Sequence, residues 1–176
     1  MDCARTSTSE SHGFNRGSVK KYIESTDAPE EEKITFFNDY EMHPFTYKVQ
    51  TIERTFLDKL FAICDYYESG KSERFSRHLY DVHKIWGSNL LHADHLKQLL
   101  PEVIEIRQLG RDTTSSQPGY PIHDTFQKII QSEFYKTDYL KNTRTFLFED
   151  VSYEQVISTL QSILQTDLLP KKIHIQ

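Results

Sequence analysis

The segment from Thr46 to Trp86 constrains the fold most, because its pattern indicates a short strand followed by two amphipathic helices. From Ile52 to about Glu68, apolar residues recur at three- and four-residue spacing, which predicts a helix with one buried stripe. That stripe consists of Ile52, Phe56, Leu60, Ile63, Cys64 and Tyr67. A second helix is expected to begin at Ser72 and to end at Gly87. The Ser-Gly turn between them is short, so the two helices are expected to pack as an antiparallel hairpin.

Charged residues lie close to both apolar stripes. Lys59 projects at the edge of the first stripe, and Arg74, Arg77 and Asp81 gather on one flank of the second helix. An arginine four residues before an aspartate stabilises a helix by only about 0.2–0.5 kcal/mol, so helix stability is a weak reason for the Arg77–Asp81 spacing. In the hairpin, Lys59 and the Asp81 flank are expected to face a common groove that suits a phosphate-bearing ligand. The alternative for Lys59 is a structural role, in which its side chain covers apolar surface and keeps its ammonium in water.

The rest of the chain predicts a mainly helical domain over residues 34–176, after a polar, loosely ordered segment at residues 1–33. Helices are expected at Ala93–Leu109, His123–Glu133 and Lys136–Lys141, and from Ser152 to about Leu164. Ser152 and Gln155 make a capping-box pattern at the start of the last helix. Two β-prone runs predict a short two-stranded β element: Ile34–Phe37 and Phe45–Thr51.

Composition limits the class of protein. A chain of 176 residues can bury a core as one domain, and a net charge of -5 argues against a broad basic surface for nucleic acid. Cys3 and Cys64 give no disulfide framework, and no run approaches the roughly 18 apolar residues of a membrane span. We therefore expect a soluble, cytoplasmic protein with no membrane partner.

Two further kinds of site are weighed against the groove. A metal site could use the histidines, because two of them at i,i+3 can share a helix face, but no third ligand follows at a typical spacing. The residues concerned are His78, His83, His92, Asp94 and His95. A Cys64 nucleophile has less support, since a thiol on an apolar stripe is usually inert. The sequence also has no Gly-rich phosphate loop, GxSxG or HExxH motif.

Two stretches carry a resemblance to a known family. Thr51–Ala62 reads T-I-E-R-T-F-L-D-K-L-F-A, and Ser76–Val82 reads S-R-H-L-Y-D-V. With them the chain resembles the AbiEii/AbiGii-type nucleotidyltransferase toxin family over about 40 residues. His78 stands where that family most often has an aspartate. The matching positions are Glu53, Asp58, Lys59, Ala62, Arg77, His78, Tyr80 and Asp81.

The resemblance implies an activity and roles for particular residues. Such proteins look like polymerase-β-type nucleotidyltransferases that move a nucleotide from a nucleoside triphosphate to an RNA acceptor, tRNA in particular, and they are usually paired with a cognate antitoxin. In that picture Lys59 and Asp81 are catalytic, with Lys59 on the triphosphate and Asp81 as the late acidic residue. Arg77 and Arg74 would bind the substrate.

The resemblance also implies a missing part. The family's earlier half carries a Gly-Ser/Thr loop and paired carboxylates that hold Mg²⁺, and no such loop followed by Asp-x-Asp precedes Thr46. We therefore expect the C-terminal part of an α+β nucleotidyltransferase-like fold, inactive alone, with its metal ligands unknown. The alternative left open is a non-catalytic helical protein-interaction module that forms a homodimer.

Overall fold

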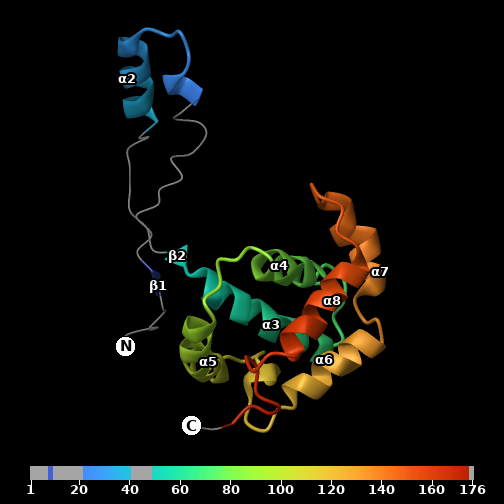
Figure 1. Ribbon diagram of the computed structural model, residues 1–176. Coiled ribbons are helices and arrows are strands. Elements are labelled where there is room, and N and C mark those ends of the chain that lie inside the picture. The colour runs from blue at the N-terminus through green and yellow to red at the C-terminus, as the bar shows by residue number, and fades with distance from the viewer. Residues whose placement is uncertain (1–7, 10–21, 41–48, 175–176) are drawn as a thin grey trace. The chain divides into compact units, whose positions relative to one another are not determined.

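The computed structural model describes residues 8–9, 22–40 and 49–174. The chain divides into two compact units, one of Thr6–Thr51 and the other of Ile52–Gln176 together with Met1–Arg5 (Figure 1). No helix among the described residues is long and apolar enough to cross a membrane.

The smaller unit contains one full helix, α2 (Glu30–Asp39), and two very short strands. The strands β1 (Thr8–Ser9) and β2 (Val49–Gln50) are two residues each and pair antiparallel, with Thr8 opposite Gln50. Pro29 occupies the N-cap position of α2, and three glutamates fill its first turn, where negative charge favours the helix dipole. No side chain of α2 is buried.

The predicted two-stranded β element is wrong. Ile34–Phe37, the expected first strand, lies inside α2, and most of the expected second strand, residues 45–48, lies outside the described residues. The acidic first turn and aromatic contacts along the helix outweigh the β preference of isoleucine and phenylalanine here. Phe36 and Tyr40, four residues apart, pack against each other in a tilted arrangement, with ring centroids 4.5 Å apart. The fold class is therefore mainly α, and in the described part of the chain no strand exceeds two residues.

The larger unit is built from helices around one central helix, α3 (Ile52–Glu68). The elements that follow are α4 (Arg77–Trp86), α5 (Ala93–Gln108), η1 (Thr114–Ser116), α6 (Ile122–Gln131), α7 (Lys136–Asp138), η2 (Tyr139–Thr143), η3 (Arg144–Phe146) and α8 (Tyr153–Leu164). α3 contacts α4, α5, η1 and α6, so more of its circumference is buried than one stripe predicts (Figure 1). Leu57 and Phe61 are fully buried in addition to the predicted stripe.

One apolar core joins these helices. Phe56 of α3 stacks on Trp86 of α4, with ring centroids 5.7 Å apart. The buried side chains that complete the core come from every longer helix of the unit and from the C-terminal tail; they include Leu79, Val82, Leu99, Val103, Phe126, Ile129, Tyr135, Tyr139, Val156, Leu160 and Ile173. This core fixes α4 against α3 and thereby sets the polar residues that lie between them.

The structure changes where the second helix begins. α4 starts at Arg77 and not near Ser72, because Arg74 has a left-handed backbone with φ 68°, which interrupts any helix running through it. The capping box predicted for the last helix is confirmed: the Ser152 hydroxyl accepts from the backbone N–H of Gln155, and the Gln155 side chain accepts from the Ser152 N–H.

Candidate functional site

Lys59 and Asp81 form an ion pair between α3 and α4. The Nζ atom of Lys59 donates to Oδ2 of Asp81 at 2.7 Å, although the two residues are 22 positions apart in the chain. Their side chains are 25% and 34% exposed, so solvent and an incoming ligand can reach both. The packing of α4 on α3 thus places a lysine ammonium and an aspartate carboxylate side by side at the surface.

His78 lies beside this pair as a neutral ring. Its imidazole stacks on Tyr66, with the two ring planes only 2° apart and the centroids at 5.6 Å. The pKa of His78 falls from its usual 6.5 to about 4, mainly because the ring is buried and in addition because the Lys59 ammonium lies nearby. Its Nδ1 atom is buried and has no hydrogen-bond partner among the described residues. At neutral pH His78 therefore adds no charge beside the Lys59–Asp81 pair.

The two predicted substrate-binding arginines occupy different places. Arg77 is exposed at the first position of α4, one helical turn before Asp81. Arg74 is exposed in the turn before α4, and its backbone N–H donates to Oδ1 of Asp138 at 2.9 Å. Within the described residues neither guanidinium makes a hydrogen bond or ion pair. Arg77 shares the helix surface of Asp81, whereas Arg74 has a structural part to play through its backbone.

A second polar network, which sequence reasoning missed, lies between α3, α5 and η1. Arg107 of α5 donates to both Asp58 and Asp65 of α3, and its Nε donates to the Ser116 hydroxyl at 2.9 Å. The backbone N–H of Ser115 donates to Asp65 at 2.7 Å. The signal in the sequence was the seven-residue spacing of Asp58 and Asp65, which puts both carboxylates on one helix face. Asp58, although part of the family motif, is held by arginine in this fold.

Comparison with known families decides the relationship. The profile described as "Nucleotidyl transferase AbiEii toxin, Type IV TA system" matches residues 21–167. The chain belongs to this family. No curated protein and no solved structure matches it.

AbiEii membership covers far more than the two motifs that suggested it. The match runs from the smaller unit to the end of α8 and includes both Lys59 and Asp81. The chain is thus a member of a family of nucleotidyltransferase toxins from type IV toxin–antitoxin systems. Membership implies a nucleotide substrate and a cognate antitoxin.

The metal that AbiEii proteins would use does not fit the described residues. No group of three or more His, Cys, Asp or Glu side chains in residues 8–9, 22–40 and 49–174 is placed to hold a metal ion. The Asp81 carboxylate is already paired with Lys59. Within the described part of the chain, the side chains therefore form no ready group of three Mg²⁺ ligands.

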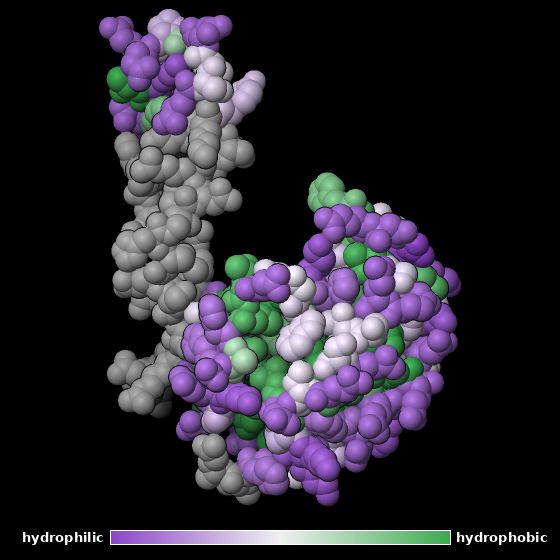
Figure 2. Space-filling view, in the orientation of Figure 1, coloured by the Kyte–Doolittle hydropathy of each residue, from purple (hydrophilic) through white to green (hydrophobic). Residues whose placement is uncertain are grey.

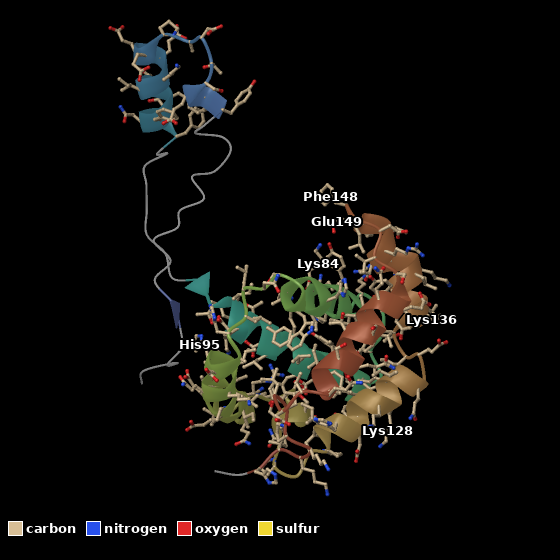
Figure 3. The ribbon with its side chains drawn as sticks, viewed as in Figure 1. Lys84, His95, Lys128, Lys136, Phe148 and Glu149 are labelled. Atoms are coloured by element: carbon tan, nitrogen blue, oxygen red, sulfur yellow. The ribbon has the colours of Figure 1, made fainter. Side chains whose placement is uncertain are left out.

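The structure also shows where the residues of the proposed histidine metal site and the proposed cysteine nucleophile lie in this AbiEii chain. His92 and Asp94 are exposed, and Nδ1 of His95 lies 3.3 Å from Oε1 of the buried Glu53 (Figure 3). Cys64 is fully buried, and burial together with the neighbouring Asp65 raises the pKa of its thiol well above the usual value. A thiol in that state is a poor nucleophile.

Proposed function

We propose that this AbiEii-family chain binds a nucleoside triphosphate at the Lys59–Asp81 pair and serves nucleotide transfer to an RNA acceptor, tRNA being the expected class. The observation that supports this most is the direct contact of Lys59 with Asp81 at 2.7 Å across α3 and α4. A lysine and an aspartate with these positions in the family motif meet at a partly exposed surface, and helix stability gives little reason for the Arg77–Asp81 spacing beside them.

The pair suits a ligand that carries phosphate. Lysine binds phosphate as a compact point charge, and an ion pair that is partly open to water is worth about 1 kcal/mol or less, so a triphosphate can take over the ammonium at small cost. Asp81 is then free to accept a hydrogen bond from the attacking hydroxyl. Arg77, exposed one turn earlier on α4, adds a second cation for phosphate.

We also propose that the 176 residues bind the nucleotide without completing the transfer. The sequence before Thr46 has no Gly-Ser/Thr loop followed by Asp-x-Asp, and the described residues offer no metal site. Lys59, Asp81 and Arg77 thus supply binding and orientation, while the paired carboxylates of the family are not among these residues.

Nucleotide binding is tested by calorimetric titration of each common nucleoside triphosphate into the full chain and two variants. Lys59→Met should weaken binding at least roughly tenfold, because the ammonium that meets the phosphate is lost. Lys136→Met is the matched control, since Lys136 of α7 is also a lysine in a 2.7 Å pair, with Glu133, and it should leave binding unchanged. Equal binding by the wild-type chain and Lys59→Met would remove the role proposed for Lys59.

Transfer is tested separately with labelled nucleoside triphosphate, Mg²⁺ and tRNA. We expect no labelled RNA from the full 176-residue chain. Efficient labelling that disappears in Asp81→Asn would support the transferase activity and overturn the proposal that the chain lacks part of its catalytic machinery.

A further inference from the structure

Two aromatic side chains project from the larger unit, one at the end of η3 and one just after it. Phe148 is fully exposed and Phe146 is 85% exposed, with the half-buried Leu147 between them. We call Phe146, Leu147 and Phe148 the Phe tip. Figure 2 shows its apolar atoms standing out at the end of a largely hydrophilic surface. Because neither ring is buried, apolar surface remains in contact with water, and folding alone gives no reason to keep it there.

The Phe tip belongs to the segment of residues 138–150, which lies alongside α4. At the start of that segment Asp138 accepts from the backbone N–H of Ser76 at 3.2 Å, and Thr143 bonds the Ser76 hydroxyl at 2.7 Å. At its end Glu149 accepts from Lys84 at 2.7 Å. Figure 3 shows Phe148 beyond Glu149, on the side of α4 where Lys84 lies.

Lys84 connects the Phe tip to the candidate site. It lies three residues after Asp81 on α4, and residues three apart are neighbours on a helix surface. The Lys84–Glu149 bond therefore holds the Phe tip close to the helix surface that carries Asp81, and Arg77 continues the same surface at the start of α4.

The charges beneath the Phe tip do not oppose a polyanion. Glu149 is paired with Lys84, and Asp150 is paired with Arg144 through two bonds of 2.6 and 2.7 Å. Each carboxylate near the rings thus has a cation of its own. Exposed aromatic rings next to cations are the usual surface for single-stranded nucleic acid, because bases stack on the rings and the backbone meets the cations.

We propose that the Phe tip stacks against unpaired bases of the RNA acceptor and so holds its single-stranded end at the α4 surface that carries Asp81. This inference rests on the proposed function, because it assigns the RNA contact of that same site. The cations that meet the RNA backbone are Arg77, Arg144 and Lys84. Arg144 and Lys84 do so while they also keep their bonds to Asp150 and Glu149.

The experiment uses the full chain and a short single-stranded RNA with 2-aminopurine near its 3′ end, a base whose fluorescence falls when it stacks. The wild-type chain should quench the probe on binding. Phe146→Ser with Phe148→Ser should abolish the quenching and weaken binding by roughly tenfold or more. Leu109→Ser is the matched control, an 85% exposed apolar residue at the end of α5, and it should change neither signal.

A second arm separates base stacking from backbone attraction. An abasic strand of equal length should bind the wild-type chain about as weakly as the double variant binds the normal strand. Normal quenching by the double variant would overturn the inference, and so would a wild-type chain that binds both strands equally. A double variant that no longer self-associates in sedimentation, with RNA binding unchanged, would assign the rings to contacts between copies and also overturn it.

Failure here can be told apart from failure of the proposed function. Nucleotide binding that depends on Lys59, together with no response of the RNA probe, removes only the role of the Phe tip. Both variants change exposed side chains, and circular dichroism with thermal unfolding will show that their folds match the wild type.

Discussion

At the residue scale, His78 is held neutral by its surroundings, and that has a consequence for stability. Its pKa is about 4 in the folded chain against 6.5 for an exposed histidine, because burial and Lys59 disfavour the charged ring. Between these two values the unfolded chain binds a proton that the folded chain does not. His78 therefore leaves the free energy of unfolding undiminished above about pH 6.5, and it lowers that free energy as the pH falls from 6.5 towards 4.

We predict that His78→Phe, which keeps a ring to stack on Tyr66, makes the free energy of unfolding less dependent on pH between 7 and 5. Urea denaturation at several pH values in that window measures this. The same decline in the wild type and the variant would show that His78 is not the group that takes up the proton.

Residues differ in how far their neighbours can be predicted from the sequence. The meeting of Lys59 with Asp81 follows from two adjacent helices joined by a short turn, so periodicity suffices to bring them to one groove. The bonds from Ser76 and Arg74 to Asp138 join residues more than 60 positions apart, and no local pattern encodes such a contact. Arg74, whose N–H donates to Asp138, has a left-handed backbone that no local pattern predicts, which is why the start of α4 was predicted too early.

At the scale of elements, α3 shows what helical periodicity leaves out. A single apolar stripe was predicted, but helices pack on several sides of α3. Leu57 and Phe61 are buried beyond that stripe, and a further, polar surface of the helix carries Asp58 and Asp65. Arg107 fills that surface: it bonds Asp58 and Asp65, and its guanidinium lies 5.2 Å from the centre of the Phe61 ring. The α2 helix shows the opposite error, since its Ile34–Phe37 run is β-prone while its acidic first turn decides the conformation.

We predict that Arg107→Met destabilises the fold by about 3 kcal/mol, because removing the arginine leaves a largely buried carboxylate at Asp65 without its ion-pair partner. Arg111→Met is the control, since Arg111 is exposed and has no ion pair within the described residues. Chemical denaturation of the three proteins gives the comparison. A loss as large in Arg111→Met would mean that surface charge, and not the buried network, sets the stability.

At the scale of the whole molecule, the division into two units predicts that the larger one folds by itself. Every buried side chain among the described residues lies at or beyond Glu53, and α2 contributes none. Deleting residues 1–51 should leave a helical protein that unfolds in one cooperative transition, with a free energy of unfolding within about 1 kcal/mol of the full chain. Circular dichroism and urea denaturation test this, and a gradual, non-cooperative loss of helix would contradict it.

The two polar sides of α3 have a practical consequence. The Lys59 side carries the proposed ligand contact, whereas the Asp58 and Asp65 side is bonded to Arg107, so the first can be altered while the second still supports the fold. We expect a Lys59→Met chain to keep its shape, because the Arg107 network on the other side of α3 is unchanged. Such a chain, lacking the nucleotide contact proposed for Lys59, is a suitable bait with which to search for the cognate antitoxin.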